Sequence, residues 1–573
     1  MLKPLAFCIF FLCFVAISSY SQNPADMPMR QVMSEAQELI GAGDYGSAAP
    51  YLDQLEIRFA GEGNPEVEKI LEQFGFVRGV GYIQNFGKTG DMSNMQKAAD
   101  AFAKFVEKYP ENENAVSAMQ QRTTCLRALQ KWEEAAEVIE ELLDEDKPFK
   151  KKILKRSELM NLYYGRAQCY HIKQNWRMGE KAFAELLKFS DLAKDEDRAA
   201  YAVSCMVEMF VQERRIDEIF PLLPRLSGDT PARFDLRLNV NLMQGAEILK
   251  EQDRQVEASL LFALTMTTEE IVTFYTSREK QITYEMDQIQ SFIDAQGRRL
   301  PPKRVTSLKN RINDLAMKAT SARSHLKLAQ STPSFTTVLR WRKADNFQAC
   351  KREWESFWAF YWLYKDFPDH EMVENFIYAA FASANTVKYR EKSIELGEEY
   401  LANKELVQFR PDVTFIMANA YRKEAVTQMG IVEELQSSLA TVDKERAAAA
   451  KTKADEYQAR FFELCDDFLE VMPEHKYSRE FIGMMGAEFF KRQEFDKLLR
   501  KFAGFENGTF NPTAGYANKK ELQGTLSMGR VNYMSGLAFL ASGNYDAAKP
   551  FLGAVVGVSI NGLPLDEAAV EED

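Results

Sequence analysis

The stretch GVGYIQNFGKTGD, residues 79–91, comes closest to a site that could do chemistry, because it resembles a phosphate-binding loop. Such a loop needs Gly, four residues and then Gly-Lys-Thr, so that backbone N–H groups surround the phosphates and the Lys reaches the terminal one. Gly87-Lys88-Thr89 is present, but Tyr82 stands five residues before Gly87, and Gly81 is one residue too far away. Residues 65–86 also carry helical rather than strand spacing, whereas the motif follows a buried strand. We therefore interpret the stretch as an interhelical loop.

Metal and acid–base catalysis need clustered side chains, and the sequence offers no obvious cluster. The four histidines (His171, His325, His370 and His475) stand far apart without an H-E-x-x-H pattern, and G-x-S-x-G is absent. Acidic residues are abundant, so a catalytic carboxylate pair stays open, although such residues in helical repeats usually form a solvated face. We predict no catalytic residues, no bound metal and no cofactor, and hence a protein that is not an enzyme.

The first 21 residues have the organisation of a signal peptide. Lys3 precedes an apolar run over residues 5–17, which is too short to span a bilayer, and Ser19 and Ser21 are the small residues of a cleavage site. We predict a mature chain that begins at Gln22, is periplasmic or secreted and has no integral membrane span. An uncleaved N-terminal anchor is the alternative.

The positions of the cysteines and the net charge exclude further classes of protein. Neither Cys8 nor Cys13 follows the small residues of a lipoprotein box, so a lipid anchor is not expected. The five remaining cysteines have no C-x-x-C pair, which indicates buried core residues rather than a disulfide framework (Cys125, Cys169, Cys205, Cys350 and Cys465). Without residues 1–21 the chain keeps 71 basic and 84 acidic residues, so nucleic acid is a poor candidate partner.

A helical repeat organises the rest of the chain. Its last copy, MGRVNYMSGLAFLASGNYDAAKPFLGAVV, alternates small and large residues at fixed offsets (Gly536, Gly543, Tyr545, Ala548, Leu552 and Val555). Small residues let two helices approach, while the large ones fill the seam between neighbours. The pattern resembles the tetratricopeptide repeat, a helix–turn–helix unit of about 34 residues. About ten irregular copies can be found, including those around Tyr45 and Trp132, and the resemblance implies an all-α solenoid.

One segment interrupts the repeat. From Val272 to Ile293 and from Val305 to Leu326, apolar residues recur with alternating spacings of three and four, and Gly297 with the Pro301-Pro302 pair separates the two runs. We predict an antiparallel coiled-coil hairpin with a cationic tip that contacts an acidic surface (Arg298, Arg299, Lys303 and Arg304). Folding back of the hairpin onto the solenoid is the alternative. The predicted domains are a signal peptide (1–21), two superhelices (22–266 and 336–556), the hairpin (267–335) and an acidic tail (557–573).

Two further segments have unusual composition. The run WESFWAFYWLYKDF, residues 354–367, is aromatic on nearly every face, so we predict a helix buried all round, with an aromatic ligand slot as the alternative. The run KPFKKKILKR, residues 147–156, is interpreted as a solvated loop rather than a site for anionic lipid or another polyanion.

We predict partner contacts on the first helices of the last units, because first helices line the concave side of stacked helix pairs (Glu480, Phe490, Lys491, Arg530, Tyr533 and Leu537). The last repeat ends near Val556 without an evident capping helix, which predicts an exposed docking face (Ala547, Phe551, Leu552 and Val555). Self-association or docking of a partner helix would cover that face, unless Val558, Ile560 and Leu563 fold back over it.

Two functions fit these features. The first is a non-enzymatic scaffold of the bacterial cell envelope, a periplasmic adaptor that binds an envelope protein or peptide within a transport, assembly or secretion machine. The second is a surface protein that binds a glycan or nutrient, similar to starch-binding helical lipoproteins built on tetratricopeptide units. The 68 aromatic residues would suit such a site, but the missing lipoprotein box and the predicted burial of residues 354–367 favour the scaffold.

Overall fold

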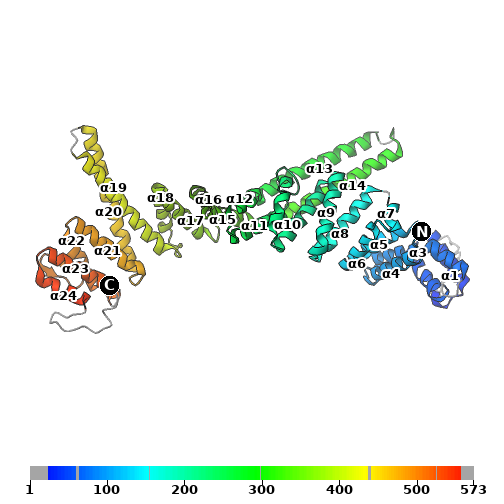
Figure 1. Cartoon of the computed structure of the whole chain (residues 1–573), viewed down its shortest axis with the longest axis horizontal. Coiled ribbons are helices and arrows are strands. Elements are labelled where there is room, and N and C mark those ends of the chain that lie inside the picture. Colours follow the sequence, from blue (N-terminus) through cyan, green and yellow to red (C-terminus); the bar gives the residue numbers. More distant parts are fainter. Residues whose placement is uncertain are drawn as a thin grey trace, which may run out of the picture. The chain divides into compact units, whose positions relative to one another are not determined.

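The computed structural model describes residues 23–59, 64–153, 155–296, 299–436, 440–523 and 526–556. The chain divides into two compact units, residues 1–333 and residues 334–573. Within each unit, consecutive helices pack against one another in pairs (Figure 1). The described residues contain one two-stranded hairpin and otherwise only helices and connections, which confirms the predicted all-α solenoid of helix pairs.

Unit 1 carries the pairs α1/α2, α3/α4, α5/α6, α8/α9, α10/η4 and α11/α12, followed by α13 and α14. The bounds of its elements are η1 (Pro24–Asp26), α1 (Met29–Gly41), α2 (Tyr45–Gln54), η2 (Leu55–Phe59), α3 (Pro65–Thr89), α4 (Ser93–Lys108), α5 (Ala115–Ala128), α6 (Trp132–Leu143), α7 (Pro148–Lys152), α8 (Arg156–Ile172), α9 (Trp176–Ala193), α10 (Glu196–Gln212), η4 (Ile216–Leu226), α11 (Leu236–Glu251), α12 (Gln255–Leu264), α13 (Thr268–Gln296) and α14 (Pro302–Gln330).

Unit 2 carries the pairs α15/α16, α17/α18, α19/α20, α21/α22 and α23/α24. The bounds of its elements are α15 (Ser334–Ala349), α16 (Glu353–Asp366), α17 (Val373–Thr386), α18 (Arg390–Ala402), α19 (Arg410–Leu435), α20 (Thr441–Val471), α21 (Lys476–Lys491), α22 (Phe495–Phe502), β1 (Phe505–Glu506), β2 (Thr509–Phe510), η6 (Tyr516–Asn518), η7 (Lys520–Leu522), α23 (Leu526–Ala541) and α24 (Tyr545–Val555).

The same turn joins the two helices of most pairs in both units. In α8/α9, Gln174 has φ 52°, the Gln174 N–H donates to the carbonyl of His171, and the Asn175 N–H donates to the carbonyl of Tyr170. This arrangement is the Schellman motif, in which a left-handed residue ends the first helix. Equivalent left-handed residues stand at the turns of other pairs (Gly43, Gln130, Arg214, Asp253, Lys351, Lys388, Gln493 and Gly543). A shared turn geometry therefore defines the repeat where the sequence spacing is irregular.

Gly in place of Gln174 is expected to stabilise unit 1. A left-handed conformation costs a residue with a Cβ about 1–2 kcal/mol, and the greater freedom of Gly in the unfolded chain takes back part of that gain. The Gln174 side chain is exposed, so little packing is lost. Gln174→Gly is expected to raise the free energy of unfolding by about 0.5–1 kcal/mol in urea denaturation. Gln174→Ala, which keeps the Cβ, is the control, and a Gly variant no more stable than the Ala variant would contradict the strain argument.

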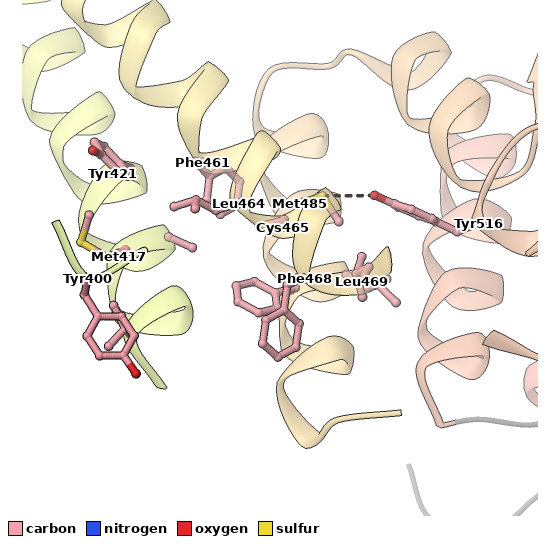
Figure 2. Close-up of a cluster of buried hydrophobic side chains, with 14 of the residues drawn as sticks. Tyr400, Met417, Tyr421, Phe461, Leu464, Cys465, Phe468, Leu469, Met485 and Tyr516 are labelled. Atoms are coloured by element: carbon pink, nitrogen blue, oxygen red, sulfur yellow. Dashed lines mark hydrogen bonds between the residues drawn. The ribbon is translucent and has the colours of Figure 1, made fainter. Parts of the chain in front are cut away.

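The core of unit 2 runs through successive helix pairs (Figure 2). Tyr400, Phe461 and Phe481 are completely buried within it. Small residues bring the helices together: a Cβ at Gly486 would lie 2.7 Å from the sulfur of Met534, and one at Gly536 would collide with Leu552. The last contact lies within α23/α24 and confirms the roles that the repeat pattern predicted for Gly536 and Leu552.

The helices α13 and α14 form an antiparallel hairpin. Arg323 donates to Glu279 at 2.6 Å and Arg311 donates to Glu285 at 3.0 Å, so residue numbers rise on one helix as they fall on the other. Near its base, Phe274 stacks on Phe234 at 4.1 Å and thereby joins the hairpin to the helix pairs of unit 1. Farther out, none of the described side chains of residues 283–314 is buried. The predicted hairpin is thus present with a packed base and an exposed outer half, while its supercoiling stays a prediction.

A half-buried histidine lies in the hairpin base. His325 of α14 stacks on Tyr275 of α13 with ring centroids 4.7 Å apart. Burial lowers the pKa of His325 below its usual 6.5, and Arg237 and Arg278 act in the same direction against the opposing carboxylates of Asp197 and Asp235. The hairpin base therefore favours the neutral form of the imidazole.

Stability at the hairpin base is expected to fall as the pH drops below about 6.5. The unfolded chain then gains a proton on His325 that the folded chain resists, so the stability present above pH 6.5 is progressively lost. Hydrogen exchange of the α13 and α14 amides at pH 7.5 and 5.5 measures this loss. His325→Phe keeps a ring but removes the titration, and an equal loss in this variant would show that other groups cause it.

Candidate functional site

The stretch that resembles a phosphate-binding loop lies at the end of a helix. Residues 79–89, including Gly87, Lys88 and Thr89, belong to α3, so the prediction of an interhelical loop was wrong for all but the last two residues of the stretch. A helix C-terminus carries partial negative charge, which repels phosphate. Lys88 pairs with Asp44 at 3.4 Å, and Gly81 lies buried against the backbone of Tyr45. Gly79 and Gly81 therefore serve helix packing, whereas no atom lies within 4 Å of a Cβ placed at Gly87.

The histidines each have structural partners. His171 contacts the hydroxyl of Tyr201 at 3.1 Å and the carboxylate of Glu208 at 2.9 Å. His370 and His475 accept backbone N–H groups two residues ahead of them. No group of three or more potential metal ligands occurs among the residues that the structure describes.

The cysteines lie inside the helix packing. Cys125, Cys169, Cys205 and Cys465 are buried free thiols, and Cys350 is half-buried. Burial raises the pKa of Cys125 and Cys169 to about 11, and it also raises the pKa of Cys205 and Cys465. A thiol with so high a pKa carries little thiolate at neutral pH and is a weak nucleophile.

The predicted contact residues of α21 and α23 differ in exposure. Glu480 and Lys491 are exposed, Tyr533 is 39% exposed, and Phe490 and Leu537 are half-buried. Arg530 is half-buried and lies against Gly483, so it occupies the seam between the two helices. The structure thus places these residues on two neighbouring first helices, and their contact with a partner stays a prediction.

The other two predicted surfaces are only partly described. At the hairpin tip, Arg299, Lys303 and Arg304 are exposed, while Arg298 lies outside the described residues. On α24, the four residues of the predicted docking face are half-buried (Ala547, Phe551, Leu552 and Val555). Phe551 packs against Phe539. Phe510 of the β1–β2 hairpin stacks on Phe551, with ring centroids 6.1 Å apart. The β-hairpin, which was not predicted, therefore covers part of this face, and the tail (557–573) lies outside the described residues.

A groove that the sequence did not reveal runs along α9 in unit 1. It has a volume of about 640 Å³ and lies between α6, α7, α8 and α9. Lys181, Glu185, Lys188 and Leu192 recur every three or four residues, so they share the face of α9 that lines the groove. The segment after α6 contributes Asp144 and Glu145 on the other side. A second hollow of about 330 Å³, lined by residues of α9, α10 and η4, shares Lys188 and Leu192 with it.

A buried arginine organises the groove floor. Arg166 of α8, with only 3% of its side chain exposed, pairs with Glu140 of α6 at 3.2 Å and also with Glu185 of α9. Two helix pairs are thereby joined through one guanidinium group, whose planar fork suits two carboxylates. Beside it, Tyr163 and Phe189 have ring centroids 4.9 Å apart and add an apolar surface. The groove thus offers an aromatic patch next to acidic and basic side chains.

The basic run 147–156 contributes to this groove. Residues 148–152 form α7 rather than a loop, and the side chains of Lys150, Lys152 and Lys155 are paired with Glu145, Glu111 and Glu158. The hydrogen bond to Glu145 raises the pKa of Lys150, which lines the groove. The prediction of a solvated loop therefore missed a short helix that borders an open groove.

The aromatic helix in unit 2 is not buried all round, which corrects the prediction for residues 354–367. Phe357, Phe360 and Leu363 of α16 are buried, as predicted, but Trp354, Trp358 and Trp362 are 50%, 39% and 54% exposed. Spaced every four residues, these tryptophans share one face of the helix. We call this row of three residues the tryptophan stripe. Its sequence signal was the four-residue spacing, which the aromatic residues on the other faces obscured.

No helix among the described residues is long and apolar enough to cross a membrane.

No known protein-family model matches the chain, and no curated protein matches its sequence. Similar solved structures include Naa15/Naa10 bound to HypK-THB, with 12% identity, a TM-score of 0.25, and coverage of 92% of this chain and 91% of that chain. The APC/C hetero-tetramer Cut9–Hcn1 has 14% identity and a TM-score of 0.20, with coverage of 93% and 88%. A monomeric mutant of IFIT1 with Gppp-AAAA has 12% identity and a TM-score of 0.19, with coverage of 76% and 95%. At these TM-scores, the similarities carry no conclusion about function.

Proposed function

We propose that the chain is a non-enzymatic scaffold of the bacterial cell envelope, which binds a protein or peptide segment in the groove along α9. The observation that carries this proposal is the groove itself, because consecutive helix pairs leave exposed apolar and charged side chains in one open concavity. Leu192, which is 63% exposed, belongs to both hollows and is the natural centre of the contact. Helix-pair scaffolds bind partners along such continuous surfaces.

The side chains of the groove define the chemistry of the partner. Phe189 and Leu192 would receive apolar side chains, which supply most of the affinity in protein interfaces. Asp144 and Glu145 on one side, with Lys181 and Lys188 on the other, would orient a segment that carries charges of both signs. The fitting partner is therefore a segment with apolar residues between a basic and an acidic end.

Site-specific photo-crosslinking tests this proposal. A benzoylphenylalanine at Leu192 is expected to crosslink one discrete partner in cells, and Lys188→Glu in the same chain is expected to reduce that product. Val256, which is 76% exposed on α12, is the matched control position. The same crosslinked products at both positions would show that the groove captures nothing specific.

The location in the cell envelope is part of the proposal and is tested separately. Lys3, the apolar run and Ser21 have the organisation of a signal peptide, so the mature chain is expected to begin at Gln22. The mature protein is then expected to be released by osmotic shock or to be found in the medium. Mass spectrometry of the native N-terminus and cell fractionation measure this. An intact Met1 on a cytoplasmic protein would remove the envelope from the proposed function.

A further inference from the structure

The tryptophan stripe gathers three of the six tryptophans of the chain on one exposed helix face. Successive members lie four residues apart, so each indole is displaced by about 6 Å along the axis of α16. Buried side chains such as Phe360 and Leu363 already anchor the opposite face of α16 in the core of unit 2. The stripe is therefore not needed to hold the helix in place, and its apolar area remains available to a ligand.

Neighbouring rings hold the indoles in position. Trp354 lies 5.7 Å from Tyr389 between ring centroids, Trp358 lies 4.9 Å from Phe357, and Trp362 lies 5.4 Å from Tyr361. Edge-to-face contacts join Tyr361 to both Trp358 and Trp362. Aromatic side chains fixed in this way lose little entropy when a ligand binds, so the stripe is organised before binding.

The charges around the stripe are paired with one another. Lys365 pairs with Glu399 at 3.0 Å, Lys392 pairs with Glu395 at 2.7 Å, and Arg352 pairs with Glu355 at 3.0 Å. Both lysines also lie over the ring of Tyr361, at 5.7 and 5.4 Å from its centroid. These ion pairs leave no net charge among the six groups, which suits an uncharged ligand whose hydroxyl groups bond to the remaining lone pairs of the carboxylate oxygens.

Exposed aliphatic side chains, which a protein helix or a lipid would require, are sparse along the chain on both sides of the stripe, where Val338 and Val407 are the nearest. From residue 339 to residue 406, the exposed large hydrophobic side chains are the three tryptophans alone. An interface that receives an apolar helix ordinarily mixes Leu, Ile and Met with its aromatic anchors, and a membrane-binding helix adds unpaired cations. Flat aromatic faces without aliphatic neighbours instead match the C–H-bearing face of a sugar ring, because that face is weakly positive and the aromatic face is negative.

We propose that the tryptophan stripe binds a neutral, linear oligosaccharide or polysaccharide across at least three consecutive sugar units, one on each indole. This site lies on unit 2, it is independent of the groove proposed on unit 1, and either proposal can fail without the other. The sugar faces stack on Trp354, Trp358 and Trp362, and the carboxylates of Glu355, Glu395 and Glu399 accept hydrogen bonds from the sugar hydroxyls.

The test uses the full mature chain and an array of neutral linear hexasaccharides, including cellohexaose, maltohexaose and laminarihexaose. Binding of the selected hexasaccharide is then measured by calorimetry and by tryptophan fluorescence. We expect the matching disaccharide to bind at least tenfold more weakly, because it reaches fewer indoles. Trp362→Ala is expected to lower the affinity at least tenfold, whereas Trp362→Phe retains a flat ring and most of the affinity.

Two variants separate sugar stacking from general apolar contact. Trp362→Leu keeps an apolar side chain without a flat face and is expected to lose affinity like Trp362→Ala, whereas Tyr284→Ala, which removes a 66% exposed aromatic ring from the hairpin, is expected to change nothing. Full affinity for the hexasaccharide in Trp362→Leu would overturn the proposal, because it would show that stacking on a flat indole does not carry the binding. Binding to no neutral hexasaccharide on the array, or binding to phosphatidylcholine vesicles that Trp362→Ala abolishes, would overturn it as well.

Discussion

Replacing Gly81 by Ala is expected to lower the free energy of unfolding of unit 1 by about 2–3 kcal/mol. A Cβ at this position of α3 would lie 2.8 Å from the carbonyl carbon of Tyr45 and closer still to its oxygen. Because this obstacle is backbone at the start of α2, the two helices must separate, and the small gain in helix propensity from Ala cannot offset that. Urea denaturation together with hydrogen exchange of the α2 and α3 amides measures the effect.

Gly87→Ala is the matched control, because it makes the same substitution in the same helix with no atom within 4 Å of the new Cβ. This variant is expected to keep the stability of the parent or to gain up to about 1 kcal/mol from helix propensity. Both glycines belong to the stretch that resembles a phosphate-binding loop, but only Gly81 packs against another helix. The two variants therefore show whether helix packing accounts for the glycine at position 81. Equal effects of the two substitutions would contradict the packing described for Gly81.

Removing the Arg166 side chain is expected to destabilise unit 1 by about 2–3 kcal/mol. Arg166→Ala deletes a buried guanidinium group and removes the cation that Glu140 and Glu185 share. The loss lies at the lower end for a buried ion pair because these carboxylates are 39% and 36% exposed and regain some hydration. Urea denaturation and hydrogen exchange of α6, α8 and α9 report the change.

The control for Arg166 is Arg214, which also joins two helix pairs but does so at the surface. Its ion pair with Glu251 has exposed side chains, 58% and 62%, so Arg214→Ala is expected to change stability by less than about 0.5 kcal/mol. A similar loss in both variants would show that burial at Arg166 does not strengthen the pair.

Local signals in the sequence predicted the helix pairs well. The offsets of Gly536 and Leu552 predicted a close approach of two helices, and the structure places these residues in contact. Gly297 and the Pro301-Pro302 pair predicted a break between two helices, and in the structure α13 ends at Gln296 and α14 begins at Pro302. Such features depend on backbone freedom and on side-chain size at one position, so a single sequence contains them.

The surfaces were harder to predict, because each depends on residues far apart in the chain. The groove along α9 exists only when α6, α7 and α8 lie beside it, and Arg166 has carboxylate partners 26 residues earlier and 19 residues later. The exposure of Trp362 similarly depends on which faces of α16 its neighbours cover, and composition alone favoured burial. The β1–β2 hairpin was missed because its strands contain only two residues each.

The most direct test of the central claim is a titration of the groove with the partner that is crosslinked at position 192. That partner, once identified and purified, is titrated by calorimetry with the wild-type chain, with Lys181→Glu/Lys188→Glu, and with Lys280→Glu/Lys309→Glu as a matched charge reversal on the hairpin. The scaffold account predicts at least tenfold weaker binding for the groove variant alone, with a smaller salt dependence. Unchanged affinity in the groove variant, or equal losses in both variants, would contradict the claim that the groove along α9 is the binding site.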